Sequence, residues 1–405
     1  MKTRLPKKQL ASVVLSVLAL AASSALAEKK YGPGASDSEI KIGQTMPYSG
    51  PASSYGTIGK AEVAYLKMIN EQGGINGRKI NLISLDDGYS PPRTVEQIRR
   101  LVEEEQVLFT FQTLGTPPNT AIQKYMNAKK VPQLLVATGA TKWGDPEHYP
   151  WTMGWQPTYQ HESHIYAKYL LKNKPNAKIG ILYQNDDYGK DYLKGFKEGL
   201  GDKAASMIVA EVSYEVTDPS VDTQIVTLQA SGADTFFNIT TPKFAAQAIR
   251  KAYDTGWRPL QFINNVSSSI ASALQPAGLD KSVGLLSSQF AKDPTDPAWK
   301  DDKGIKDYLS FMKKYYPDGN PDDILNVYGY GAAQTLVQIL KQCGDDLTRD
   351  NVMRQGANLK DLEVPTLLPG IRINTSPTDF YPIEQVQLMR FDGKTWVRFG
   401  ELMSR

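Results

Sequence analysis

The hydrophobic pattern changes its period repeatedly along the chain, and this alternation restricts the possible folds more than any other feature. Short apolar runs rich in β-branched residues, such as residues 40–45, alternate with longer stretches such as residues 55–71, in which apolar residues recur every three or four positions. Strands that alternate with helices in this way are typical of βαβ units, whose strands lie parallel in one sheet. The sequence therefore predicts an α/β fold.

The alternation occurs in two series. In the first, strands are predicted at residues 40–45, 79–86, 108–111 and 133–136, and helices at residues 55–71, 90–105 and 119–129. In the second, strands are predicted at residues 178–183, 207–212, 235–239 and 260–263, and helices at residues 161–172, 188–200, 222–231 and 244–255. Two doubly wound parallel sheets with right-handed crossovers follow from this repetition.

The C-terminal part completes both halves rather than starting a third. Helices are predicted at residues 301–314 and 326–342, and strands at residues 385–391 and 395–399, which Asp392-Gly393-Lys394 joins as a hairpin. The 378 residues after Ala27 exceed one ordinary hydrophobic core. We predict two lobes joined by a multi-crossover hinge, with residues 38–157 and 290–368 in lobe 1, and residues 158–289 and 369–405 in lobe 2.

The N-terminus resembles a secretory signal peptide. Four basic residues lie within the first eight positions, residues 10–22 form an apolar run, and Ala25-Leu26-Ala27 is a small-residue cleavage site. The apolar run is too short to span a bilayer. We predict a signal peptide at residues 1–27, cleavage after Ala27 and a periplasmic mature protein.

Charge and cysteine content exclude several classes of protein. The net charge is +3, but four of the 46 basic residues precede residue 28, which leaves 42 basic and 43 acidic side chains, interspersed along the chain. We therefore expect no nucleic-acid partner. We also expect the protein to be a monomer. The single cysteine, Cys343, excludes an intrachain disulfide and follows an apolar helical stretch, which indicates a buried structural thiol.

Patterns typical of enzymes are incomplete. His161 and His164 lack the four-residue spacing of a zinc-protease helix, and residues 56–61 lack the hydroxyl residue of a phosphate-binding loop. No Gly-x-Ser-x-Gly nucleophile motif follows a predicted strand. We predict that the protein is not an enzyme, with no catalytic residue, metal or cofactor.

Loops rich in glycine and hydroxyl residues follow three predicted strands of the first series, at residues 46–56, 112–118 and 137–141. Each loop alone is typical of helix capping and turns. Because parallel strands present their carboxyl ends at one edge of a sheet, all three offer N–H groups and hydroxyls at the same place, which suits a carboxylate. Loops at residues 184–189, 240–243 and 264–267 provide a matching edge in the second series.

The ordered set of motifs resembles one family. It comprises Ile42-Gly43, Tyr48-Ser49-Gly50-Pro51, residues 69–78, Asp86-Asp87, residues 137–141 and Asp186-Asp187-Tyr188-Gly189. Together these resemble the branched-chain amino acid binding proteins of ABC importers, which are type I periplasmic solute-binding proteins, over nearly all of the mature chain. The resemblance implies a receptor that closes on a small molecule by hinge motion and delivers it to membrane permease and ATPase subunits.

The resemblance also implies a set of cleft residues. These are Tyr55, Gly115, Thr116, Ala137, Thr138, Gly139, Thr141, Tyr188, Thr240, Asn264 and Asn265. We expect the ring of Tyr188 to cover the ligand and its hydroxyl to donate a hydrogen bond. Trp155, Tyr159 and Phe290 are candidates for ring-stacking walls, with core packing as the alternative.

One loop departs from the pattern of the amino-acid-binding members. They resemble one another in an acidic residue that pairs with the ligand ammonium, whereas residues 263–269 contain no acid. Burying an unpaired ammonium is costly. We therefore expect a carboxylate without an amine, most consistent with an aromatic acid of the hydroxybenzoate or cinnamate type, and residues 367–371 and 374–377 resemble that branch.

Two alternatives remain open at this stage. Asp186, Asp187 or Glu162 could reach the cleft and pair with an ammonium, which would make the protein a receptor for a branched-chain or other amino acid or amide. The same closed form could also serve a periplasmic sensor that signals without transport.

Overall fold

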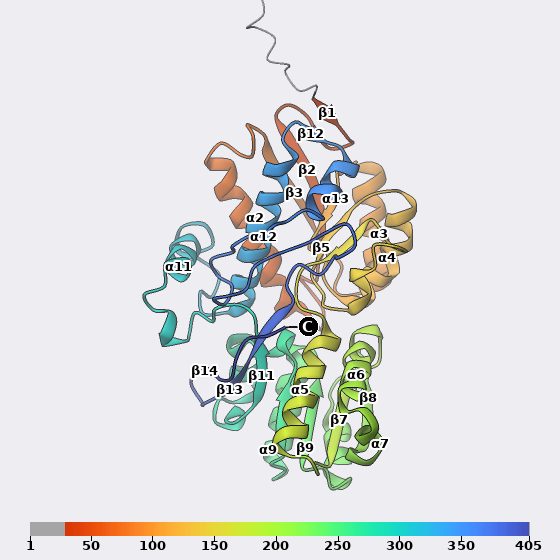
Figure 1. The fold of residues 1–405 in the computed structure, drawn as a ribbon, viewed down its shortest axis with the longest axis vertical. Helices are drawn as coiled ribbons and strands as arrows, with labels where there is room; N and C mark the ends of the chain where they lie inside the picture. The colour runs from red at the N-terminus through yellow and green to blue at the C-terminus, as the bar shows by residue number, and fades with distance from the viewer. Residues whose placement is uncertain (1–28, 405) are drawn as a thin grey trace, which may run out of the picture.

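Two separate β-sheets divide the molecule into two lobes, each flanked by helices (Figure 1). The computed structural model of the protein describes residues 29–404, so the predicted signal peptide lies outside the described residues. The predicted α/β architecture of two lobes is confirmed. Among the described residues, no helix has the length and apolar character needed to cross a membrane.

The first sheet is entirely parallel. Its order is β3 (Lys79–Asp86), β2 (Glu39–Met46), β4 (Thr110–Phe111), β5 (Gln133–Val136) and β6 (Thr152–Gly154). All four residues of β5 are buried, as expected for an inner strand covered on both faces. The flanking helices form two pairs, α2 (Gly56–Glu71) against α12 (Ile324–Cys343), and α3 (Pro91–Arg99) against α4 (Thr116–Ala128).

The second sheet has a parallel part and an antiparallel edge. The parallel strands are β11 (Leu286–Gln289), β10 (Leu260–Ile263), β9 (Thr235–Ile239), β7 (Ile179–Gln184) and β8 (Ile208–Tyr214), in that order. The edge consists of β13 (Gln385–Phe391), β14 (Trp396–Arg398) and β15 (Met403–Ser404). Helix α5 (Tyr159–Asn173) packs on α6 (Asp187–Leu200), and α8 (Asp222–Ala230) packs on α9 (Pro242–Asp254). The predicted hairpin between β13 and β14 is confirmed.

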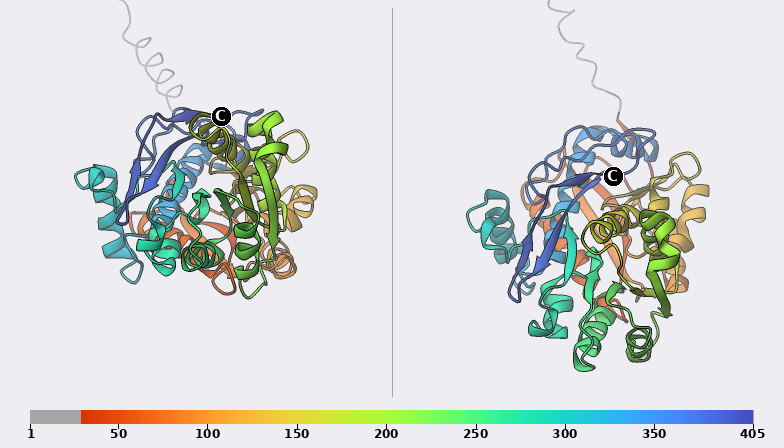
Figure 2. Two further views of the ribbon diagram at one scale, coloured as in Figure 1. Left: turned by 90° about the horizontal axis from the view of Figure 1, so that it is seen from below. Right: turned by 60° about the horizontal axis from the view of Figure 1, so that its bottom comes forward.

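C-terminal segments contribute to both lobes. In Figures 1 and 2, the blue helix α12 lies with the red N-terminal elements, whereas the blue β13–β14 hairpin lies beside the second sheet. The segment that follows β11 runs antiparallel to the segment around Leu367, because Ala291 is bridged to Leu367 and the Leu368 N–H donates to the Phe290 carbonyl at 2.9 Å. The exact lobe boundaries stay a prediction.

Predicted and observed elements agree best where the apolar pattern is strongest. The bounds of β3, β5, β9, β10 and β13 are identical to those predicted. The elements that were not predicted include β6, β11 and α13 (Arg349–Gly356), together with short elements such as β1 (Lys30–Tyr31) and β12 (Asp346–Leu347). Strand β11 contains Ser287 and Ser288, both fully buried, so its sequence lacks the apolar run that marks a buried strand. Cys343 is buried at the end of α12, as predicted.

Candidate ligand-binding site

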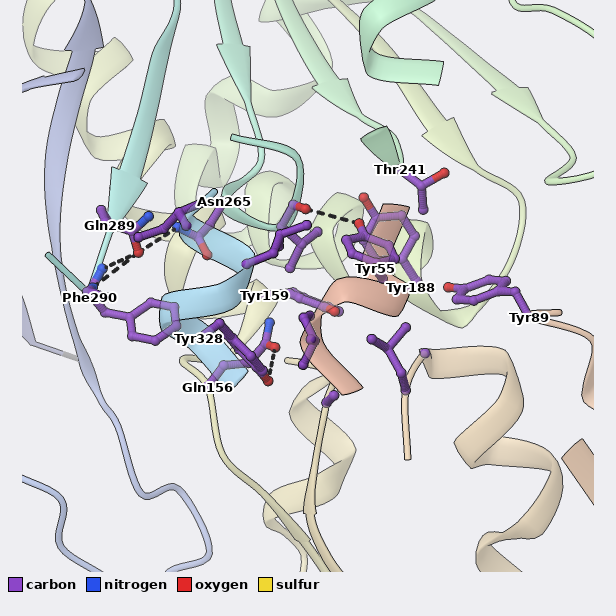
Figure 3. Close-up of a pocket in the computed structure, with 18 residues that line it drawn as sticks. Tyr55, Tyr89, Gln156, Tyr159, Tyr188, Thr241, Asn265, Gln289, Phe290 and Tyr328 are labelled. Carbon is purple, nitrogen blue, oxygen red and sulfur yellow. Dashed lines mark hydrogen bonds between the residues drawn. The ribbon is translucent and has the colours of Figure 1, made fainter. Parts of the chain in front are cut away.

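A cavity of about 60 Å³ lies where the carboxyl ends of the two sheets meet (Figure 3). This is room for roughly four to six water molecules, or ~120–180 Å³ of liquid, which suits a small organic acid or an amino acid. Residues that follow β2, β3, β4 and β5 line one side, and residues that follow β7, β9, β10 and β11 line the other. The first turns of α12 complete the wall with Ile324, Leu325 and Tyr328. The cavity therefore occupies the position predicted from the loop pattern.

The wall is mostly aromatic and aliphatic. Tyr159 and Phe290 line the cavity, whereas Trp155 lies behind it, with its ring 4.7 Å from that of Tyr328 and 5.9 Å from that of Phe290. Tyr159 also packs edge-on against Tyr188, with ring centroids 5.4 Å apart. None of the 18 described residues that line the cavity carries a charge.

Five of the predicted site residues lie on the cavity wall: Tyr55, Gly115, Ala137, Tyr188 and Asn265. The side-chain amide of Asn264 accepts a hydrogen bond from the Tyr188 hydroxyl and donates to the carbonyls of Asn238 and Thr240, at 3.2 and 3.1 Å. Tyr188 therefore offers its ring to the cavity, while its hydroxyl is used within the second lobe. Thr240 lies behind the wall, where its hydroxyl donates to Asn238 Oδ1 at 2.6 Å.

Thr116 and Thr138 lie just beneath the wall. Their hydroxyls form a 2.6 Å hydrogen bond with each other, and the Thr138 oxygen also accepts from Tyr159 at 3.3 Å. Both side chains are buried. The main chain beside these hydroxyls is less satisfied. The N–H groups of Thr116 and Gly139 have no hydrogen-bond partner among the described residues.

Thr141 lies away from the cavity, on the outer side of the lobe interface. Its N–H and hydroxyl donate to Asp191 Oδ2 at 2.8 and 3.0 Å. Gly139 is also off the wall, but it sets the position of a wall residue, since a Cβ there would lie 2.5 Å from the Pro157 oxygen and 2.7 Å from the Tyr159 ring. Direct contact between ligand and these two residues stays a prediction.

Gly115 is the one wall position where only glycine fits. Its φ of +99° belongs to the region that side chains disfavour, and a Cβ would lie 2.4 Å from the Tyr89 ring. Tyr89 is itself held at a φ of +61° and is buried. Gly115 and Tyr89 therefore fix each other's position on the wall.

Several contacts hold the two lobes together around the cavity. The Tyr55 hydroxyl donates to the Val266 carbonyl at 3.0 Å, and Lys142 Nζ lies 2.7 Å from Asp187 Oδ2. The hydroxyls of Ser269 and Ser272 donate to the two oxygens of Asp323 at 2.8 and 2.9 Å. Since each contact joins loops of different sheets, the structure represents a closed arrangement.

The three carboxyl groups considered as ammonium partners do not line the cavity. Asp187 pairs with Lys142, which lowers its pKa, and Asp186 caps α6 by accepting from the Tyr188 N–H at 2.9 Å. Glu162 accepts from the Tyr166 and Tyr192 hydroxyls and from the Asn265 N–H, each at 2.7 Å. Burial raises the pKa of Glu162 to about 7 despite these donors. Glu162 thus supports the wall from behind.

A family model described as periplasmic binding protein matches residues 39–395. The chain belongs to the periplasmic binding protein family. This periplasmic binding protein is 24% identical over 318 residues to Leu/Ile/Val-binding protein homolog 1 of Brucella suis biovar 1 (strain 1330), covering 77% of this chain and 81% of that protein.

Solved structures share the fold of this periplasmic binding protein. One is a branched-chain amino acid ABC transporter protein from Thermus thermophilus with bound valine, with a TM-score of 0.81, 16% identity, and coverage of 92% of this chain and 98% of that one. Another is a fatty acid ABC transporter substrate-binding protein from Thermomonospora curvata, with a TM-score of 0.76, 22% identity, and coverage of 93% and 95%.

Several wall residues of this periplasmic binding protein were not predicted. They are Ile58, Tyr89, Leu114, Gln156, Thr241, Val266, Gln289, Ala291, Ile324, Leu325 and Tyr328. Leu114, Thr241 and Val266 lie in loops that were predicted to form the site, although these residues were not singled out. Tyr89 lies three residues after β3, so the rule that sites lie at carboxyl ends could have included it. No sequence pattern predicted that α12 would line the cavity. Gln289 is the last residue of β11, a strand that was not predicted.

Proposed function

We propose that this periplasmic binding protein is the ligand-capturing component of an ABC importer and encloses a small carboxylate between its lobes. Its partners would be the permease and ATPase subunits of that importer. The observation that carries the proposal is the cavity itself, which lies at the carboxyl ends of both sheets and is enclosed by cross-lobe contacts. The ABC transporter proteins named among the structural neighbours support the importer role.

Capture would proceed by a shift between open and closed forms. Tyr55, Lys142 and Asp323 make contacts that exist only when the lobes meet. A ligand that contacts both walls binds the closed form better, and it shifts the population only by that difference in affinity. We expect dissociation constants in the micromolar range or tighter, about −8 kcal/mol.

The carboxylate would bind beside Gly115, at the N-terminus of α4. The free N–H groups of Thr116 and Gly139 lie in loops that line or support this wall. Free N–H groups and the helix dipole both favour an anion. Pro117 and Pro118 lack N–H groups, so Thr116 supplies the donor of the first helical turn.

We propose an aromatic acid as the ligand. The rest of the wall contains the aromatic rings of Tyr159, Phe290 and Tyr328. None of the described lining residues carries a charged group that could pair with an ammonium. An ammonium buried there without a partner would lose several kcal/mol. One structural neighbour is named as a fatty acid ABC transporter substrate-binding protein, and a fatty acid is likewise an apolar carboxylate.

A branched-chain amino acid is the second candidate. The relatives named as Leu/Ile/Val-binding protein homologs and the neighbour with bound valine favour it. The small volume of the cavity is also compatible with valine or leucine. For this ligand, the ammonium would have to use carbonyl and hydroxyl oxygens of the wall.

Isothermal titration of the purified mature protein tests these candidates. We expect saturable binding of hydroxybenzoates or hydroxycinnamates, no binding of their methyl esters, and weaker binding of leucine and valine. Binding of leucine or valine alone would select the second candidate. Absence of saturable binding across carboxylates and amino acids would refute the receptor function. Loss of ligand uptake in a gene-deletion strain distinguishes import from sensing.

A further inference from the structure

Gln289, at the end of β11, leaves the NH2 group of its side-chain amide unused on the cavity wall. Its Oε1 accepts from the N–H groups of Phe290 and Ala291, at 2.9 and 3.2 Å. Because two main-chain donors define where the oxygen lies, the other atom must be Nε2. Nε2 has no hydrogen-bond partner in the part of the chain that the structure describes. Gln289 is only 5% exposed, so bulk water has little access to it.

Asn265 leaves the complementary acceptor unused. Its Nδ2 donates to the Ser288 carbonyl at 2.5 Å and lies 3.4 Å from Gln289 Oε1. These acceptors fix the orientation of the amide, so Oδ1 is the remaining atom, and it has no hydrogen-bond partner within residues 29–404. The N–H of Asn265 donates to Glu162, which holds the loop in place.

The two amides are neighbours at one end of the cavity. Figure 3 shows Asn265 and Gln289 together, on the opposite side from Tyr89. The adjacent residue on the wall, Phe290, is apolar. The other carboxamide on the wall, Gln156, accepts a hydrogen bond from the Tyr328 hydroxyl at 2.9 Å, and within residues 29–404 it forms no hydrogen bond with Asn265 or Gln289.

One donor beside one acceptor matches a hydroxyl group, which accepts one hydrogen bond and donates another. Polar atoms that stay unpaired when a ligand excludes water cost free energy. A wall of this kind therefore discriminates against a ligand that places a C–H group there.

We propose that Asn265 and Gln289 form a distal subsite that binds a hydroxyl at the end of the ligand far from its carboxylate. This inference rests on the proposed function and narrows the ligand class to hydroxylated aromatic acids. Unsubstituted aromatic acids and branched-chain amino acids lack the group that this subsite requires. Glu162 acts as a positioning residue for Asn265.

Titration of the wild-type protein with two matched ligand pairs tests the subsite. The pairs are 4-hydroxybenzoate with benzoate, and 4-hydroxycinnamate with cinnamate, so that ring length is varied independently of the hydroxyl. We expect the hydroxylated member of at least one pair to bind at least tenfold more tightly. Equal affinities within both pairs would overturn the subsite but leave the receptor function intact, whereas no binding of any carboxylate would be a failure of the function itself.

Variants identify the residues responsible. Gln289→Met removes the donor at nearly constant volume and should reduce the affinity ratio within the pair to about one. Gln156→Met is the matched control, a second wall carboxamide whose loss should leave that ratio unchanged. If Gln289→Met keeps the wild-type ratio, or Gln156→Met abolishes it, the assignment is wrong. The wild-type comparison decides the hydroxyl preference even if a variant does not fold.

Discussion

Replacing Gly115 by alanine should damage both the stability of the protein and its ligand affinity. The φ of +99° and ψ of 141° at this position cost a residue with a side chain about 1–3 kcal/mol. The new Cβ would also lie 2.4 Å from the Tyr89 ring, an overlap that typically costs a further ~1–3 kcal/mol. Tyr89 cannot retreat easily, because it is buried and its backbone is held at a positive φ.

The two costs can be separated experimentally with a matched control. Gly73 has a φ of +103°, and a Cβ there would meet no atom within 4 Å, so Gly73→Ala carries the backbone strain without the overlap. Urea denaturation should show a loss of about 2–6 kcal/mol for Gly115→Ala and about 1–3 kcal/mol for Gly73→Ala. Displacement of Tyr89 should weaken ligand binding about tenfold or more in Gly115→Ala alone, since about 1.4 kcal/mol is a factor of ten. Equal losses of stability together with unchanged affinity would refute this account of the wall.

Three further predictions concern charge and reactivity. Lys142→Met should weaken ligand affinity by less than about fivefold at low salt and leave the affinity unchanged at about 0.5 M salt. The reason is that the ion pair of Lys142 with Asp187 is partly exposed, so salt screens it. A loss of affinity that persists at high salt would contradict this prediction. Burial raises the pKa of Glu162 from 4.5 to about 7. Between pH 4.5 and pH 7, the folded protein therefore keeps a proton that the unfolded chain releases, so the free energy of unfolding should fall as the pH rises through this range. Urea denaturation at pH 5 and pH 8 should show that Glu162→Gln removes roughly 3 kcal/mol of that fall, and an identical pH dependence in both proteins would disprove it. The buried Cys343 thiol, whose pKa burial raises to about 12, should resist thiol reagents until the protein is unfolded, and rapid labelling of the native protein would exclude this environment.

Strands and helices were predictable where burial leaves a clear apolar pattern. Strand β9, Thr235–Ile239, is buried along its whole length, and its bounds follow directly from its apolar run. Strand β11 was not predictable, because Ser287 and Ser288 are buried among polar partners such as the Tyr166 hydroxyl, 3.1 Å from Ser288 Oγ. A buried polar strand has no sequence signal of its own, since its hydrogen-bond partners come from distant segments.

The edge of the sheets that carries the site was predictable, but the direction of each side chain was not. Gly115 and Ala137 follow predicted strands and line the cavity. Thr116 and Thr138 were predicted as cleft residues from the family resemblance, yet their hydroxyls bond to each other, a pairing that only the packed structure determines. Tyr328 comes from α12, which directly follows none of the strands that end at the cavity, so its contribution depends on a tertiary contact that no local pattern encodes.

A crystal structure with the tightest-binding carboxylate of the titration panel tests the central claim most directly. The account predicts one ligand enclosed between Tyr188 and Phe290, with its carboxylate within hydrogen-bond distance of the Thr116 N–H. A ligand bound outside this cavity, or one whose carboxylate pairs with a surface lysine or arginine, would contradict it.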